Sequence, residues 1–320
     1  MTKVSVVIPT FNAGPEFEEL LQKISSQERD FEHEIVVVDS ESTDGTAELA
    51  RRYGATVHQI AKQKFNHGAT RNLGISLSRG EYIALTVQDS VPLDERWLYA
   101  MVENLERDER VAGVYSRQLP REEADVLTRA VVNARRTASL ERREQPGESP
   151  KRYRRMNPRK RRRLATFDDV SSCIRRSVWE EMPFERTSFG EDLRWSKRVI
   201  EAGYKIVYEP RSAVIHSHER GVMYDLRRHY VDQRLSLELF GLRLVPNVLR
   251  LLVSIPRAAL ENYRLLRRES SMGKLWLVVL AVEHAVAPQI GLYLAGKGPA
   301  ISRLSPRAFG KLDRFLSRGV

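Results

Sequence analysis

Two polar segments, far apart in the sequence, carry the residue types best suited to chemistry. Residues 65–74 read Phe-Asn-His-Gly-Ala-Thr-Arg-Asn-Leu-Gly, which puts a cation, two amides and an imidazole on one short turn before a helix. Such a turn can hold a diphosphate or a nucleoside. In the second segment, Glu191 and Asp192 follow a glycine at the start of an amphipathic helix. A donor-binding turn together with a carboxylate pair indicates group transfer.

Three carboxylate positions have both a chemical and a structural interpretation. Asp39 follows a buried strand, where it can accept hydrogen bonds from a base or ribose, or cap a turn. Asp89, within Gln88-Asp89-Ser90, can hold Mg²⁺ or Mn²⁺, or be an ordinary turn residue. The Glu191–Asp192 pair can supply a general base, or stabilise a helix N-terminus through its dipole.

His216 and His218 alternate at the end of a predicted strand and therefore face the same side of it. One of them can ligate a metal ion, since imidazole is a common ligand, or both can be structural.

The elements that must position these residues form an α/β pattern. Apolar runs at 3–8, 34–38, 55–60 and 82–87 alternate with helical segments, which predicts a doubly wound, mostly parallel sheet. Ligands bind beyond the carboxyl ends of such strands, where the polar turns 10–12, 39–44 and 88–90 meet. A further strand is predicted at 204–215.

The rest of the chain is predicted to be mainly helical. An amphipathic helix is expected at 122–140, and a mobile basic loop at 151–163, where Pro158 interrupts a run of Lys and Arg. No strand is predicted beyond about residue 222. We therefore expect a catalytic domain at 1–225 and a helical, membrane-proximal region at 226–320.

Composition limits the class of protein. The 320 residues are 42% hydrophobic, which supplies a sizeable core. Cys173 is the single cysteine, so an internal disulfide and a cysteine-rich metal site are excluded. The first residues lack a signal-peptide pattern and enter a strand directly, so a cytoplasmic location is expected.

The net charge of +11 implies an anionic partner. Residues 1–110 are acidic on balance, so the basic excess lies in the later segments. The segment 151–163 holds one aromatic ring, Tyr153, and the chain has no nucleic-acid-binding motif. Phosphate or an anionic membrane surface is therefore preferred to nucleic acid as the partner.

The helical remainder contains two apolar stretches, at 242–260 and 275–295. The second is long enough to span a bilayer, but Glu283, His284 and Pro288 interrupt it, which favours an interfacial or partly buried helix. A last helix is expected from Pro306, either lying on anionic lipid or docked on the domain.

Taken together, these segments resemble the family 2 inverting glycosyltransferases with a GT-A fold and, within them, the bacterial rhamnosyltransferases. The similarity covers residues 1 to about 220. The segments that carry it are 4–12, Val38-Asp39-Ser40, 42–46, 65–74, Gln88-Asp89-Ser90, 190–193 and His216-Ser217-His218.

The resemblance implies a role for each site residue. Pro9, Thr10 and Asn12 would line the nucleotide pocket, with Asp39 on the base or ribose. The turn around His67 and Arg71 would contact the donor nucleotide and its diphosphate, with Gln88 also on the donor side. Asp192 would be the catalytic base, with Glu191 beside it.

The resemblance also implies a divalent cation, Mg²⁺ or Mn²⁺. Asp89 matches the second carboxylate of the family's Asp-x-Asp motif, whereas Val87 occupies the first position. The ion would then depend more on the diphosphate and on a histidine, either His216 or His218. His216 is preferred because it follows Asp192 at nearly the spacing of the family's metal-ligand histidine.

The expected function is transfer of L-rhamnose from dTDP-rhamnose to a hydroxyl of a glycan or lipid-linked oligosaccharide in cell-surface polysaccharide synthesis. The enzyme would be cytoplasmic and peripherally bound to the inner face of the cell membrane. The alternatives are a UDP-hexose donor, or a non-enzymatic protein that binds polyanions or membranes. A nucleotidyltransferase is disfavoured because the turn at 10–14 lacks the expected Gly-rich, basic character.

Overall fold

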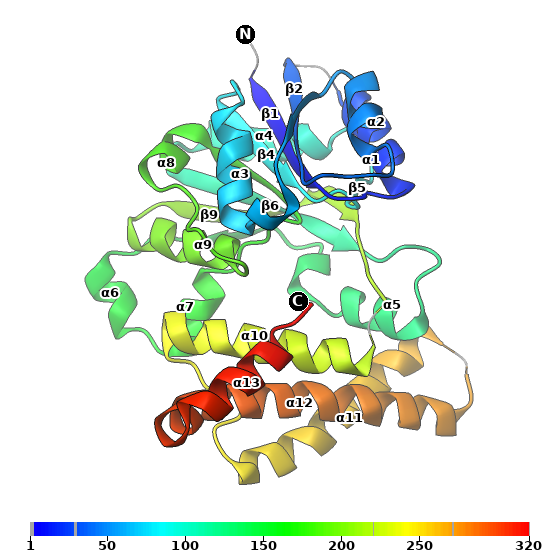
Figure 1. The fold of residues 1–320 in the computed structure, drawn as a ribbon, viewed down its shortest axis with the longest axis vertical. Coiled ribbons are helices and arrows are strands. Elements are labelled where there is room, and N and C mark those ends of the chain that lie inside the picture. Colours follow the sequence, from blue (N-terminus) through cyan, green and yellow to red (C-terminus); the bar gives the residue numbers. More distant parts are fainter. Residues whose placement is uncertain (1–2, 29–30, 220, 271, 320) are drawn as a thin grey trace. The chain divides into compact units, whose positions relative to one another are not determined.

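The computed structural model describes residues 3–28, 31–219, 221–270 and 272–319, and the chain divides into two compact units (Figure 1). Unit 1 takes the described residues of 1–119, 136–157 and 163–216, and unit 2 those of 120–135, 158–162 and 217–320. Unit 2 is therefore assembled from three separate stretches of the chain.

Unit 1 is built on a mixed sheet of nine strands in the order β3-β2-β1-β4-β8-β6-β9-β5, with β7 paired to β9. The strands are β1 (Val4–Thr10), β2 (His33–Asp39), β3 (Thr56–Gln59), β4 (Tyr82–Thr86), β5 (Val91–Pro92), β6 (Val111–Leu119), β7 (Arg143–Gln145), β8 (Ser171–Arg175) and β9 (Lys205–Ile215). The strands predicted near residues 3–8, 34–38, 55–60, 82–87 and 204–215 are all present.

The direction of the strands decides which loops meet. β1, β2, β3 and β4 are parallel, whereas β8 lies antiparallel between β4 and β6. Because β6 and β9 are parallel to each other, both run in the same direction as β4. The carboxyl ends of β1, β2, β4, β6 and β9 and the amino end of β8 therefore share one edge of the sheet, which we call the ligand edge.

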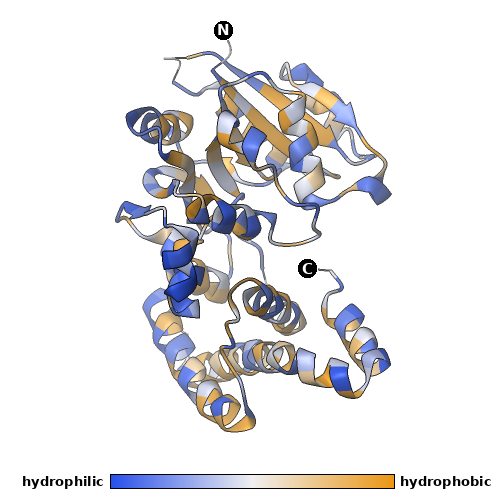
Figure 2. Ribbon diagram, turned by 90° about the vertical axis from the view of Figure 1, so that its left-hand side faces the viewer, coloured by the Kyte–Doolittle hydropathy of each residue, from blue (hydrophilic) through white to orange (hydrophobic). Residues whose placement is uncertain are grey.

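Helices and short 3-10 turns surround this sheet. They are α1 (Glu16–Ser25), α2 (Thr46–Arg52), η1 (Lys62–Lys64), α3 (His67–Ser76), α4 (Trp97–Arg107), η2 (Arg136–Ala138), α6 (Pro150–Arg155), α8 (Arg176–Glu181) and α9 (Glu191–Glu201). Val6 and Ile8 of β1 pack in one cluster with Phe17 and Leu20 of α1. Val7, on the opposite face, lies against Gly74 of α3. Burial on both faces explains why the central strands are continuously apolar (Figure 2).

Unit 2 is helical. It contains α5 (Val126–Asn133), α10 (Val222–Phe240), α11 (Val248–Glu269), α12 (Lys274–Leu304) and α13 (Pro306–Leu316), and α7 (Pro158–Leu164) begins in it. One apolar cluster joins α5, α11 and α12 through Leu127, Leu266 and Leu277. A second cluster joins α10, α12 and α13. Among the described residues, α12 alone is long and apolar enough to cross a bilayer, and a third of its most apolar window is buried.

Two predicted segments differ from the structure. The expected helix at 122–140 is shorter, because Asp125 accepts a hydrogen bond from Thr128 N (2.8 Å) and starts α5 there. The loop prediction for 151–163 was wrong, since the segment forms α6 and α7. Ser149 caps α6, and Pro158 opens α7 at a first-turn position where proline is tolerated. The predicted last helix from Pro306 is confirmed as α13.

Candidate active site

Asp39 occupies the point where β1 and β2 end, opposite its register partner Thr10. Its carboxylate is fully buried and accepts hydrogen bonds from Thr10 Oγ1 (2.9 Å), from Ser42 N (3.0 Å) and Oγ (2.5 Å), and from Gln59 Nε2 (3.4 Å). Here Asp39 therefore ties the turn after β2 to the end of β1, which is the turn-capping interpretation of this residue.

Asn12 shapes the turn after β1. Its φ of 43° is left-handed, a conformation that asparagine tolerates better than most residues. Its N–H donates to Ser42 Oγ (2.8 Å), and its side-chain oxygen accepts from Thr43 N (2.9 Å). The turns after β1 and β2 are thus locked together.

Gln88, in the loop after β4, holds the turn after β1 through two hydrogen bonds. Its Oε1 accepts a hydrogen bond from Phe11 N (2.8 Å), and its Nε2 donates to Phe11 O (3.2 Å). The half-buried Pro9 precedes this turn. The five residues predicted to line a nucleotide pocket or contact the donor there (Pro9, Thr10, Asn12, Asp39 and Gln88) therefore lie together at the ligand edge.

The turn at 65–74 binds mainly to other parts of the protein. Asn66 caps α3, and its side-chain oxygen also accepts a hydrogen bond from Thr187 N (3.1 Å). The side-chain amide of Asn72 makes two hydrogen bonds to the backbone of Phe184. Its Nδ2 donates to the carbonyl oxygen (2.8 Å), and its Oδ1 accepts from the N–H (3.1 Å). A methyl group on Gly68 would overlap the carbonyl oxygen of Glu185. The turn therefore packs against the segment 184–191, which leads to the carboxylate pair, and helps to position it.

Arg71 is buried in an ion pair with the carboxylates. Its Nε donates to Glu191 Oε1 (3.0 Å) and lies 3.5 Å from Asp169 Oδ2, and its Nη2 donates to Asp169 O (3.3 Å). With 4% exposure, its guanidinium contacts protein groups in this structure, whereas the sequence predicted a contact with the donor diphosphate.

His67, in contrast, stays at the surface. Its side chain is 44% exposed, with Nδ1 4.0 Å from Glu191 Oε1 and its ring edge-on to Phe65. Phe65 is also exposed, so these two rings are the part of the turn best placed to meet a ligand.

Asp192 belongs to a cluster of carboxylates that the sequence did not predict. Burial, followed by the negative charges of Glu191, Asp169 and Asp168, raises the pKa of Asp192 well above its ordinary value. The N–H of Leu193, which donates to Asp192 Oδ1 (2.6 Å), acts in the opposite direction. Burial also raises the pKa of Asp169 to about 7, although Arg71 opposes the shift.

Asp168 and Asp169 reach this cluster because β8 is antiparallel. They precede β8, so its amino end brings them to the ligand edge, where Asp168 accepts a hydrogen bond from Gln118 Nε2 at the end of β6 (2.8 Å). Two adjacent carboxylates before a strand were visible in the sequence. The direction of that strand was not.

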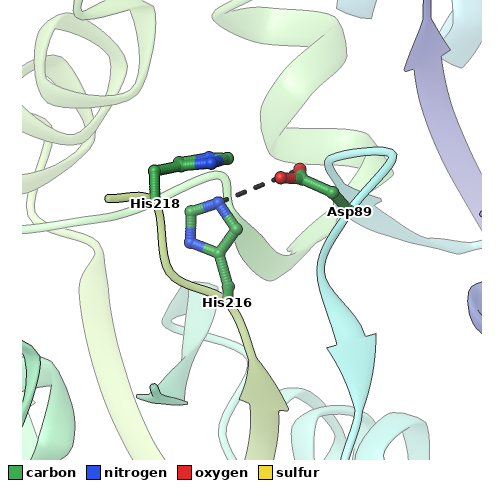
Figure 3. Close-up of side chains that lie close together, drawn as sticks. All are labelled: Asp89, His216 and His218. Atoms are coloured by element: carbon green, nitrogen blue, oxygen red, sulfur yellow. Dashed lines mark ion pairs between the residues drawn. The ribbon is translucent and has the colours of Figure 1, made fainter. Parts of the chain in front are cut away.

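Asp89 and His216 meet at the same edge, from the loop after β4 and the end of β9 (Figure 3). His216 Nε2 lies 3.9 Å from Asp89 Oδ1, and both side chains are largely buried. Together with the exposed His218, they offer three ligand atoms within 4.8 Å of one another. His218 follows His216 by only two positions, which keeps it close to His216 along the chain.

This donor set fits a divalent cation. A carboxylate oxygen and imidazole nitrogens converge from two separate loops, and both groups are ordinary ligands of divalent metals. Val87, at the other position of the predicted metal motif, contributes its backbone N–H to Val170 O instead (3.3 Å). The candidate ligands that lie together are therefore Asp89, His216 and His218, and their binding of a cation stays a prediction.

Comparison with known proteins gives one family match, to "Glycosyl transferase family 2" over residues 5–182. The O-antigen chain rhamnosyltransferase WbaN of Salmonella anatum is 29% identical over 72% of this chain and 71% of its own length. The O-antigen chain rhamnosyltransferase RfbN of Salmonella typhimurium is 28% identical over 71% of this chain and 70% of its own.

Two solved structures share the fold. Residues 1–349 of S. aureus TarS, in complex with UDP-GlcNAc, match with a TM-score of 0.56 and 18% identity, covering 98% of this chain and 86% of that one. The mannosyltransferase PcManGT of Pyrobaculum calidifontis, in complex with GDP-Man and Mn²⁺, matches with a TM-score of 0.52 and 20% identity, covering 98% and 84%.

Proposed function

The chain belongs to glycosyl transferase family 2 and has a GT-A fold, and we propose that it moves L-rhamnose from dTDP-rhamnose to a hydroxyl group of a glycan or lipid-linked oligosaccharide, with inversion. Its similarity to two O-antigen chain rhamnosyltransferases along most of both chains supports the donor sugar. A UDP-hexose is the alternative donor.

The observation that carries the proposal is the environment of Asp192. A general base works best when its pKa lies near the working pH, and an ordinary aspartate is too acidic for this task. Burial and three neighbouring carboxylates move the pKa of Asp192 upward, in the required direction. Arg71 holds Glu191, the adjacent residue, and so orients the start of α9.

The proposed step is a single displacement. The acceptor O–H gives its proton to the Asp192 carboxylate, and the oxygen attacks the anomeric carbon from the face opposite the leaving group. The bond from that carbon to the diphosphate oxygen breaks, and its electron pair leaves with the nucleoside diphosphate. Configuration at the anomeric carbon inverts because bond formation and bond breaking occur on opposite faces.

Asp89 and His216, with His218 beside them, would hold the divalent cation that this family uses. When bound there, the cation supplies positive charge that stabilises the leaving diphosphate. The protein's own contribution is to place one carboxylate and an imidazole 3.9 Å apart at the edge where the nucleotide turns also lie.

Replacement of Asp192 by Asn tests the assignment of the base. The amide keeps the shape of the side chain but cannot take the proton, so transfer should fall by at least 100-fold, the lower range for general-base catalysis. Donor binding should persist, measured by thermal shift with dTDP-, UDP- and GDP-sugars and divalent ions. Near-normal turnover by D192N would exclude Asp192 as the base, and stabilisation by a UDP-hexose instead of dTDP-rhamnose would favour the alternative donor.

We further propose that the enzyme works in the cytoplasm at the inner face of the cell membrane. The support is the basic charge of the later segments together with the apolar character of α12. Recovery of the full chain in the membrane fraction, and its release by high salt, would be the expected result.

A further inference from the structure

We propose that the helical hairpin α11–α12 is a docking face for an anionic lipid bilayer, with α11 lying in the plane of the interface. The proposal concerns unit 2 by itself and does not depend on the transfer reaction.

The part of α11 from residue 248 to 260 leaves an apolar stripe uncovered. Five of its side chains are between 49% and 71% exposed: Val248, Leu249, Leu252, Val253 and Leu260. Leu249, Leu252, Val253 and Leu260, with Pro256 between them, recur at intervals of three or four residues, so they share one side of the helix. Monomeric soluble proteins rarely expose a contiguous apolar surface of this kind.

An arginine stripe runs beside the apolar one. Arg250, Arg257 and Arg264 are exposed and seven residues apart, which places them above one another on the helix. They form no ion pair with any residue that the structure describes. The helix carries five arginines against two glutamates. An apolar stripe bordered by cations is the pattern of a helix that lies on anionic lipid.

The first turns of α12 extend the apolar surface. Leu275, Trp276, Val279 and Val282 are between 43% and 80% exposed, whereas Leu277 and Ala281 on the other side contact Leu266 of α11. Trp276 suits this place because indole rings prefer the boundary between lipid and water. Between the two helices, an open pocket is lined by three cations, Arg267, Arg268 and Lys274, and by one carboxylate, Glu269. Its net positive charge matches lipid phosphates.

Two other arrangements fit the structure less well. A second copy of the chain could cover the apolar stripe, but a symmetric dimer would bring two arginine stripes together, and the centres of such interfaces are depleted of charge. Insertion of α12 across the bilayer would require it to leave its neighbours. It packs so closely on α10 that a methyl group on Gly291 would overlap the carbonyl oxygen of Leu226.

The experiment is co-sedimentation of the full chain with vesicles of phosphatidylcholine alone or mixed with phosphatidylglycerol. We expect binding to the anionic vesicles that falls as salt is raised, and little binding to the neutral ones. Each basic residue near an anionic surface contributes roughly a fivefold change in affinity, so R250Q/R257Q/R264Q should weaken binding by about 100-fold. The variant L249Q/V253Q/L260Q should also lose binding.

A matched control removes the same charge elsewhere. R51Q/R52Q/R96Q replaces three exposed arginines of unit 1 and should bind vesicles like the unmodified chain. An equal loss in this control would overturn the proposal, since net charge alone would then explain binding. Two further results would also overturn it: a stable dimer, seen by sedimentation velocity, that does not bind vesicles, and retention of the chain in membranes after alkaline carbonate extraction, which indicates a spanning helix.

Discussion

At the scale of single residues, the environment of Asp192 is the feature with the most direct consequences. The charges of Glu191, Asp169 and Asp168 act on its carboxyl group, and the buried Arg71 pairs with Glu191 and Asp169. Neighbouring carboxyl groups repel one another when all are ionised, which raises the free energy of the fully ionised state. Some of them therefore bind protons at pH values where an ordinary carboxyl group would not. If Asp192 is the base, as proposed, transfer should therefore be sensitive to pH.

The pH dependence of transfer should show this coupling. Since the pKa of Asp192 is raised, the base becomes protonated and transfer is lost as pH falls through that raised value. The variant E191Q removes the negative charge that raises this pKa most, so the pKa of Asp192 should fall and the acid limb of kcat/KM should move to lower pH.

Glu185 provides a control in the same segment. It is half-exposed and pairs with Arg194 (3.6 Å), so E185Q removes a carboxylate without touching the buried cluster. Its acid limb should coincide with that of the unmodified enzyme. An unmoved limb in E191Q would show that Glu191 does not tune the base.

The two histidines at the ligand edge should differ in metal binding. His216 is 12% exposed and faces Asp89, whereas His218 is exposed. A ligand held by its surroundings loses less freedom on binding, so H216A should weaken Mn²⁺ affinity more than H218A, as measured by electron paramagnetic resonance of free Mn²⁺ with and without nucleoside diphosphate. Equal or reversed effects would favour His218 as the main ligand.

At the scale of elements, most residues of the turn at 65–74 and of α3 contact other parts of the protein, whereas their residue types indicated contact with the donor. Four of its residues contact Asp169 or the segment 184–191, more than 90 residues further along the chain: Asn66, Gly68, Arg71 and Asn72. The turn therefore positions the start of α9, on which Asp192 sits. Contact with the donor stays a prediction for its exposed members, Phe65 and His67.

Gly68 tests this role, because α3 can approach Glu185 only without a side chain at that position. G68A should force the segment away, lowering the free energy of unfolding by about 1–3 kcal/mol, as overpacking does, and reducing kcat. Urea denaturation and transfer assays measure both effects.

Gly310 offers a matched control. It lies inside α13 with no near neighbour except the flexible end of Arg314, so G310A should leave stability unchanged or raise it by up to ~1 kcal/mol. If G68A were as harmless as G310A, the close packing of α3 on this segment would not be needed.

At the scale of the whole molecule, unit 2 is discontinuous in sequence. The helix α5 comes between strands of unit 1, yet Leu127 and Ala130 pack against α11 and α12 near the other end of the chain. The helical region is therefore not a tail that can be removed at a single point.

Deletion of residues after about 225 should consequently give an aggregating protein. The deletion removes most of α10 and all of α11 and α12, and leaves the apolar side of α5 without its partners. Removal of residues 305–320 alone keeps that cluster, so this shorter deletion should remain largely soluble. Size-exclusion chromatography distinguishes the two outcomes, and a monomeric, well-folded chain ending at 225 would contradict this prediction.

Much of the fold follows from local sequence. Alternating apolar strands and helices predicted an α/β sheet, and the rule that ligands bind beyond parallel strands predicted the edge where Asp39, Gln88, Asp89 and His216 now lie. The prediction of a loop at 151–163 was wrong. It relied on the rule that runs of charge usually lie in loops, whereas Ser149 and Pro158 favour the start of the two helices found there.

The sequence by itself determined the residue types of the site and the edge of the sheet to which most of them belong, because strand periodicity and chain direction are local properties. Only the tertiary structure decided which partners each one has. It turned β8 antiparallel, which brought Asp168 and Asp169 to Asp192, and it buried Arg71 against Glu191. The pairing of β8 with β4 and that of Arg71 with Glu191 join residues about 90 to 120 positions apart, and they are set by packing that no short segment specifies.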